Sequence, residues 1–194
     1  LIADDNQSFT VGGDWSKGTT GTFTHSGGTV TMNADALATS KTIGGAATTF
    51  NSLTISAGTD TYTLGVATTV SGNLTVGAST ILTMGNFAFT VTGTSGITGT
   101  VNTATGATGL RTFTGLVTIN SGGVWDLSGQ NPATSFAGGI TMNGTTFNNG
   151  SGAAAFSETQ TLAGSTQMVF GGTLTPASTK TVTSNNTDLY VAGT

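Results

Sequence analysis

The sequence repeats one short apolar pattern at a nearly constant interval. Each copy has two apolar residues flanking a single residue, and the first step between copies is 21 residues while the last is 23. A gap of 43 residues separates the second copy from the third, which leaves room for one degenerate copy near Ile97. The apolar pairs are Leu53 and Ile55, Leu74 and Val76, Val117 and Ile119, and Ile140 and Met142. A period of about 20–25 residues is typical of a solenoid, whose repeats stack because none buries its apolar face alone.

The composition indicates an all-β chain. Only 6% of the 194 residues are charged, and the deficit is filled by 45 Thr and 31 Gly. Thr and Gly are disfavoured in helices, and the strong helix formers Glu, Lys and Arg are nearly absent. The expected fold is a parallel β-solenoid, or β-helix, with coils of about 21–23 residues. An antiparallel β-sandwich is the alternative, because short hairpins with Gly turns would show the same alternation.

Short alternating segments cover most of the chain, and they place apolar side chains on one strand face and hydroxyls on the other. A second apolar series follows the first, so each coil is expected to contain at least two strands, with roughly nine coils in all. This second series consists of Leu64, Met84, Leu127 and Phe147. The residues expected in the core are Phe50, Leu53, Ile55, Leu74, Val76, Val117, Ile119, Ile140 and Met142.

Residues 1–11 are expected to lie outside the repeat, as an N-terminal cap or as a strand exchanged with a neighbouring subunit, and residues 12–194 to form a single solenoid domain. The last strand, around Tyr190, has no polar capping helix after it. An uncapped solenoid end exposes strand edges, so this end is expected to meet another copy or more of its own chain. The expected assembly residues are Leu1, Ile2, Phe9, Val11, Leu189, Tyr190 and Val191.

The sparse charge favours self-association and excludes other partners. No charged residue and no His occurs between Thr61 and Leu110, so little repulsion opposes contact between copies. The four basic residues are scattered, which excludes a phosphate-binding stripe for nucleic acid. No apolar run is long enough to span a membrane as a helix.

The localisation expected from the sequence is extracellular or at the cell surface. The chain begins at Leu1 rather than Met, which suggests a mature product with its secretion signal removed, or a fragment of a longer protein, whereas the absence of Cys does not decide the compartment.

The sequence offers no clear catalytic or metal site. Its eight acids are spread along the whole chain, and Asp60 and Asp126 are expected to lie three coils apart, too far to act as a carboxylate pair. His25 is the single imidazole and lies beside a predicted turn, with neither Cys nor acid nearby to complete a zinc site or a triad. A non-enzymatic protein without cofactors is therefore expected.

Two binding roles remain as alternatives. Trp15 and Trp125 are candidate platforms for stacking on a surface glycan, although each could instead fill a wide coil. Paired threonines resemble the water-ordering face of ice-binding solenoids, but their spacing does not follow the coil period and predicts no continuous ladder. The pairs are Thr29 and Thr31, Thr61 and Thr63, Thr90 and Thr92, Thr112 and Thr114, Thr173 and Thr175, and Thr181 and Thr183.

The segments TFNSLTI (residues 49–55) and SGNLTV (residues 71–76) resemble the repeats of secreted bacterial and archaeal surface β-helices, such as autotransporter passengers and adhesin-like fibre proteins. This resemblance covers most of the chain from about Trp15 onward and implies a secreted structural or adhesive role. The leading hypothesis is a structural subunit of a surface filament, sheath or adhesive stalk, assembling end to end or by strand exchange. A glycan-binding or ice-binding module is the alternative, and a polysaccharide-cleaving enzyme would require acids clustered on one face.

Overall fold

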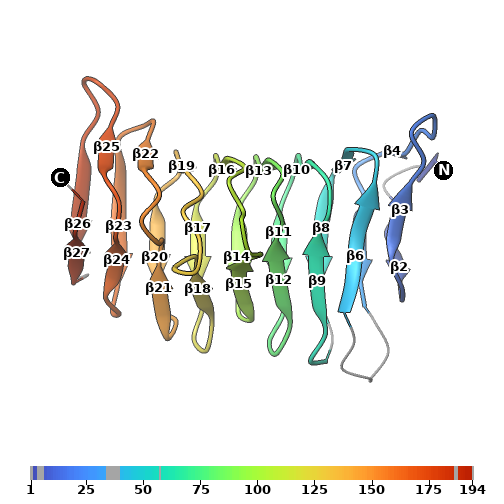
Figure 1. Ribbon diagram of the computed structural model, residues 1–194, viewed down its shortest axis with the longest axis horizontal. Helices are drawn as coiled ribbons and strands as arrows, with labels where there is room; N and C mark the ends of the chain where they lie inside the picture. The colour runs from blue at the N-terminus through green and yellow to red at the C-terminus, as the bar shows by residue number, and fades with distance from the viewer. Residues whose placement is uncertain (1, 4–6, 34–39, 57, 186–187, 194) are drawn as a thin grey trace.

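The chain winds into a parallel β-solenoid, shown by a computed structural model that describes residues 2–3, 7–33, 40–56, 58–185 and 188–193 (Figure 1). Every strand pairing between described residues is parallel, and each pairing joins one coil to the next. The expected solenoid is therefore confirmed and the antiparallel sandwich is wrong. The described part of the chain contains no helical segment with the length and apolarity that a membrane crossing requires.

Three stacked sheets form the sides of the rod, so a typical coil has three strands, which agrees with the expectation of at least two. Sheet I consists of β2 (Phe9–Val11), β5 (Thr29–Met32), β8 (Ser52–Ile55), β11 (Leu74–Val76), β14 (Ser95–Ile97), β17 (Val117–Ile119), β20 (Ile140–Met142), β23 (Gln160–Gly164) and β26 (Val182–Asn185). Sheet II consists of β3 (Trp15–Lys17), β6 (Ser40–Gly45), β9 (Thr61–Leu64), β12 (Ile81–Met84), β15 (Thr100–Thr103), β18 (Val124–Asp126), β21 (Thr146–Asn148), β24 (Met168–Phe170) and β27 (Leu189–Val191). Sheet III consists of β7 (Thr48–Phe50), β10 (Thr68–Val70), β13 (Phe89–Val91), β16 (Arg111–Phe113), β19 (Thr134–Phe136), β22 (Ala154–Phe156) and β25 (Leu174–Pro176), and β1 (Ile2–Ala3) pairs separately with β4 (Thr24–His25).

The register of sheet I reproduces the sequence period. Leu53 pairs with Leu74, and Val117 pairs with Ile140, which are the steps of 21 and 23 residues. The degenerate copy expected in the gap is β14, where Ser95 and Ile97 stand beside Leu74 and Val76. Nine described strands stack in each of sheets I and II, so about 38 Å separates the first strand from the last at ~4.8 Å per step.

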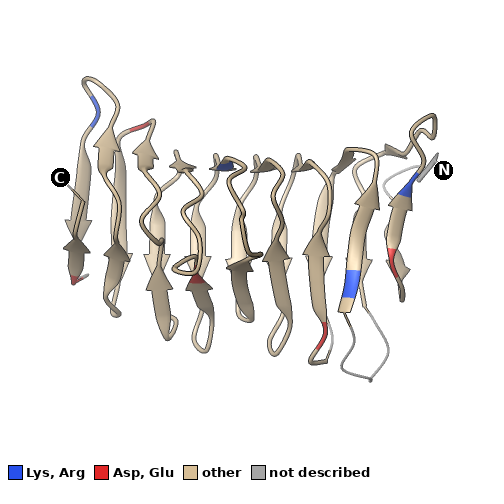
Figure 2. Cartoon of the chain, viewed as in Figure 1, with Lys and Arg blue, Asp and Glu red and all other residues tan. Residues whose placement is uncertain are grey.

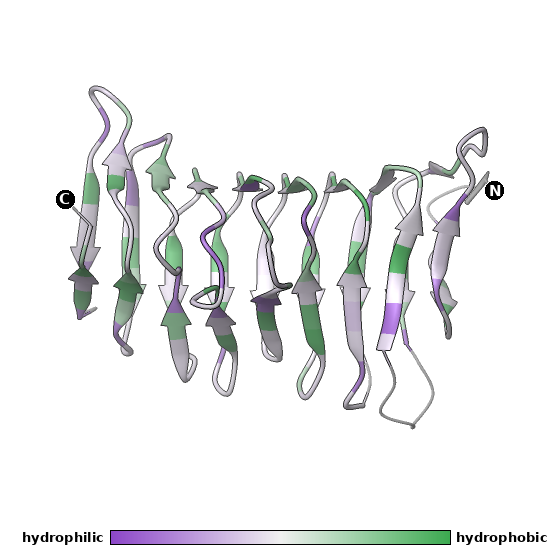
Figure 3. Ribbon diagram, in the orientation of Figure 1, coloured by the Kyte–Doolittle hydropathy of each residue, from purple (hydrophilic) through white to green (hydrophobic). Residues whose placement is uncertain are grey.

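The core runs along the rod axis as columns of side chains in register. All nine residues expected in the core are buried, with at most 2% of their surface exposed. Hydrophobic segments recur at similar levels in successive coils (Figure 3). In the second series Leu64 pairs with Met84 as expected, but Phe147 pairs with Trp125 and so belongs to a neighbouring column.

The N-terminal boundary expected after residue 11 is not an edge of the solenoid. Strand β2 (Phe9–Val11) pairs in register with Val30, Thr31 and Met32 and is the first strand of sheet I. The chain alternates in the same way on both sides of this point, so the first coil begins before residue 12.

Glycines serve the corners in two ways. Gly45 has a φ of 84°, and Gly27, Gly122 and Gly139, each adjacent to a second glycine, also have positive φ, whereas neither glycine of the pairs Gly12-Gly13 and Gly171-Gly172 does. Gly85 shows the second use, because a Cβ there would collide with the Leu64 carbonyl oxygen of the preceding coil. Coils approach too closely at this corner for any side chain.

Candidate functional surfaces

The outward face of sheet I carries a ladder of threonines. Successive strands place Thr10, Thr31, Thr54 and Thr75 beside one another in register. Gly96 interrupts the ladder, which resumes with Thr118 and Thr141. Neighbouring members are one strand spacing apart, ~4.8 Å, because the pairing is parallel and unshifted.

Sheet III presents a second array of small side chains, and this one is wider. Its central outward column places Thr49, Thr69, Thr90 and Thr112 in register, followed by Ser135. Alanines flank the column on one side, and hydroxyl residues flank its middle part on the other. The flanking residues include Ala67, Ala88, Ala133 and Ala153 before the strands, and Ser71, Thr92 and Thr114 after them. The described residues of this face contribute no exposed charged side chain, because Arg111 points inward and is buried.

The six threonine pairs proposed from the sequence form no single continuous ladder, as expected, because they are divided among the faces. Thr31 lies on sheet I, Thr63 on sheet II and Thr90 on sheet III. Because each coil crosses all three faces, neighbouring Thr-x-Thr segments in the sequence need not share a face. The ladders follow the coil period of each sheet instead.

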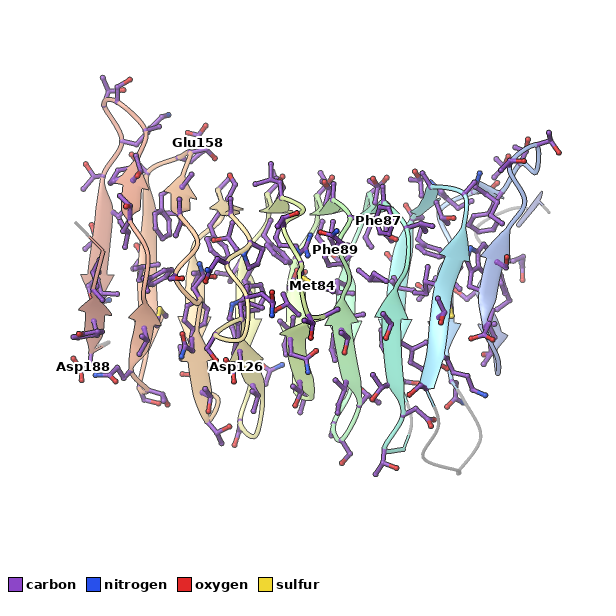
Figure 4. All side chains as sticks on the ribbon, viewed as in Figure 1. Met84, Phe87, Phe89, Asp126, Glu158 and Asp188 are labelled. Atoms are coloured by element: carbon purple, nitrogen blue, oxygen red, sulfur yellow. The ribbon has the colours of Figure 1, made fainter. Side chains whose placement is uncertain are left out.

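Exposed large apolar side chains border sheet III near its middle. Phe87 is 49% exposed at the corner before β13, and Leu110 is 48% exposed just before β16. Leu116, after β16, is 39% exposed. Figure 4 shows Phe87 near the edge of the rod, close to the buried Phe89.

At the N-terminal end, the expected assembly residues belong to the first coil. Phe9 is partly buried, and its ring stacks against that of Trp15, with centroids 6.2 Å apart. Val11 is also partly buried against the core. Leu1 lies outside the described residues, and the backbone of Ile2 pairs with Thr24. In the described part of the chain, β2 has β5 on one side and no strand on the other.

At the C-terminal end, β27 is the last strand of sheet II. Leu189 packs partly against the core, whereas Tyr190 and Val191 are 54% and 40% exposed. Strand β27 pairs with β24 and has no described strand on its outer side. Of the assembly residues expected from the sequence, Phe9 and Val11 thus lie on the first described strand of sheet I and Leu189, Tyr190 and Val191 on the last described strand of sheet II, whereas Ile2 lies in the separate β1–β4 pair.

Neither tryptophan is placed to stack on a glycan. Trp125 is fully buried, where its indole N–H donates to Asn149 Oδ1 at 3.3 Å and Asn149 Nδ2 donates to Thr134 Oγ1 at 2.8 Å. Trp15 is 8% exposed and packs edge-on against Phe23 and Phe50. The alternative weighed for both, that they fill wide coils, is the correct one.

A cavity of about 220 Å³ lies at the first coil, beside Trp15 and Phe23. Lys17 Nζ lines it and donates to the Gly21 carbonyl oxygen at 3.3 Å. The remaining lining is backbone and hydroxyl groups of residues 16–22, so the cavity holds no carboxylate or imidazole among its described residues.

The described acids do not form a cluster. The register separates Asp60 from Asp126 by three coils, or about 14 Å along the rod, which exceeds the spacing of a glycosidase carboxylate pair. Glu158 forms an ion pair with Lys180, on a corner away from Asp126 and Asp188 (Figures 2 and 4). No group of three or more His, Cys, Asp or Glu residues that could hold a metal occurs among the described residues, and Asp4 and Asp5 lie outside them.

Arg111 is buried, and its burial was not predicted from the sequence. Its guanidinium donates to the carbonyl oxygens of Gly85, Phe87 and Gly109, the last at 2.6 Å, and fills a corner between sheets II and III. Burial lowers the pKa of Arg111 from its ordinary value, and the group stays charged at neutral pH because that value is so high. The position follows Phe89 in its column, so periodicity alone predicts an apolar residue there.

No family model matches the sequence, and comparisons with curated proteins and with solved structures found no match.

Proposed function

We propose that this chain is a non-enzymatic structural subunit that stacks end to end with its own copies into an extracellular filament, sheath or adhesive stalk. The observation that carries the proposal is the continuous parallel stacking of the described strands of sheets I and II from the first coil to the last. Core columns continue through sheets I and II up to strands β2 and β27, whose outer sides have no described partner. Exposed strand edges of this kind pair readily with further strands.

Stacking is favoured over strand exchange. Strand β2 already pairs with β5 of its own chain, and Phe9 already packs against Trp15. An exchanged strand would have to break these contacts first, whereas an added coil keeps them. The surface supports assembly as well, because a net charge of -4 on 194 residues gives weak repulsion between copies.

Light scattering and electron microscopy across a concentration series test this proposal. The wild-type chain should form rods longer than one subunit as concentration rises. Val191→Lys should suppress them, because a charge on an edge strand opposes strand addition. Leu116→Lys is the matched control, since Leu116 is similarly exposed but lies on the side of the rod. A wild-type chain that stays monomeric at high concentration would contradict the proposal.

Ice binding is the second candidate, favoured by the array on sheet III. Thr69, Thr90 and Thr112, followed by Ser135, present methyl and hydroxyl groups there in register at a regular strand spacing of ~4.8 Å, and the described residues of the face add no exposed charge. Such a surface can hold water in a regular arrangement. Glycan binding is not favoured, because both candidate stacking residues, Trp15 and Trp125, are buried.

Ice-recrystallisation assays separate the two candidates. If sheet III binds ice, Thr112→Tyr should abolish the inhibition of crystal growth, because a large ring breaks the flat array. Thr118→Tyr makes the same change on sheet I and should have little effect. Absence of any inhibition by the wild-type chain would eliminate ice binding and leave the structural proposal standing.

A further inference from the structure

We propose that copies dock head to tail in one register, in which Val191 of one copy lies beside Trp15 of the next. This inference rests on the proposed end-to-end assembly and adds the residues that meet at the junction. The partner is a second copy of the chain, and the contact is a tenth coil added to a stack of nine described strands on sheet II.

The register follows from one inward column of sheet II. Trp15 pairs with Ile43, Ile43 with Leu64, and Leu64 with Met84. At the other end the same inward position is held by Phe170, which pairs with Val191. The column therefore begins at a tryptophan and ends at a valine.

Both ends of this column present apolar surface that a second copy would cover. Val191 is 40% exposed although it occupies a core position, because no described coil follows it. At the opposite end the partly buried Phe9 and Phe23 surround Trp15, and no described strand precedes β3 on sheet II. Covering apolar area of this kind stabilises association by roughly 25 cal/mol per Å² before the costs of docking.

Charge does not oppose the docking. In this register Lys17 lies beside Gly193 and Asp14 beside Tyr190, so no two like charges meet on sheet II. The backbone edge of β27 meets the free edge of β3 in the parallel orientation used by every other pair of coils. A head-to-head contact would instead bring β3 of one copy against β3 of the other, antiparallel, and would end the column there.

Outward positions on the same strands give a direct test. Ser16 follows Trp15 and Ala192 follows Val191, both are exposed, and the chain contains no cysteine of its own. The variant Ser16→Cys with Ala192→Cys, treated with a short thiol-to-thiol cross-linker, should give covalent dimers, trimers and higher species. Facing side chains on parallel neighbours lie about 5 Å apart, within reach of such a reagent.

Three further variants calibrate the result. Thr31→Cys with Thr54→Cys should cross-link within one chain, because these residues already pair. Ser16→Cys with Ser128→Cys should give no ladder, because Ser128 is exposed in the middle of the rod. Ser16→Cys with Tyr190→Cys probes a register shifted by two residues, in which Leu189 would replace Val191 beside Trp15. Circular dichroism checks that each variant keeps the wild-type fold.

The outcomes test the proposed register separately from the proposed end-to-end assembly. A ladder with Ala192→Cys and none with Tyr190→Cys is the expected result. A ladder with Tyr190→Cys alone, or polymers that do not cross-link at either position, would overturn the register and leave end-to-end assembly in place. Wild-type chains that remain monomeric would overturn both proposals.

Discussion

At the scale of single residues, a few buried polar side chains interrupt the otherwise apolar core. Arg111 bridges a corner by donating to three carbonyl oxygens, and Asn149 links Trp125 to Thr134. These polar groups fix local geometry that aliphatic side chains would leave undefined. Sequence reasoning missed Arg111 because its position in the repeat is that of Phe89 one coil earlier.

Replacing Arg111 with Leu should lower the free energy of unfolding by about 1–3 kcal/mol, because three buried carbonyl oxygens lose their donor. Chemical denaturation measures the change. Lys180→Leu removes another basic residue, from an exposed ion pair, and should cost less than about 1 kcal/mol. A neutral Arg111→Leu variant would mean that desolvation of the guanidinium offsets all three hydrogen bonds.

Gly85→Ala should lower the free energy of unfolding by about 1–3 kcal/mol, because the new methyl group meets the Leu64 carbonyl and the corner has to move. Gly129→Ala is the control, since nothing lies within 4 Å of a Cβ at that position. The control should be neutral or slightly stabilising. Equal effects on the two thermal midpoints would contradict a role for close packing at the Gly85 corner.

At the scale of strands, the sequence predicts sheet I well and sheet III poorly. Sheet I alternates apolar and hydroxyl residues at a steady period, so its register and its buried residues could be read in advance. In sheet III the inward positions include Thr48, Thr68 and Arg111, which hide the alternation. The inward threonines are tolerated because each hydroxyl donates to a carbonyl two residues earlier. The array of small residues on the opposite side of sheet III was missed for the same reason.

Strand β14 is the weakest copy of the sheet I pattern, and repairing it should stabilise the rod. Ser95 points inward between Leu74 and Val117, is 1% exposed, and its hydroxyl has no partner among the described residues. Ser95→Val should raise the free energy of unfolding by about 1 kcal/mol, because a buried unsatisfied hydroxyl is removed. Thr118→Val, on the outward side of β17, should change stability by less than about 0.5 kcal/mol. A destabilised Ser95→Val variant would show that the coil has no room for two methyl groups.

At the scale of the whole molecule, the described charges are few (Figure 2), and the proposed junction places no ion pair between copies on sheet II. Salt should therefore have little influence on assembly. Raising sodium chloride from low concentration to about 1 M, where exposed charges are fully screened, should leave the mass of sedimented filament unchanged or slightly higher. Dissolution of filaments by salt would show that ion pairs hold the subunits together.

The parallel ladders also decide how the rod responds to tension. Hydrogen bonds between coils run along the rod axis, so a pull on its two ends loads each interface in series and detaches the coils one after another. Each detached coil frees about 22 residues, which lengthens the tether by about 70 Å. Force spectroscopy on a single subunit should record a sawtooth of nearly equal steps. A rod of this kind extends and dissipates energy under load, coil by coil, before it fails completely.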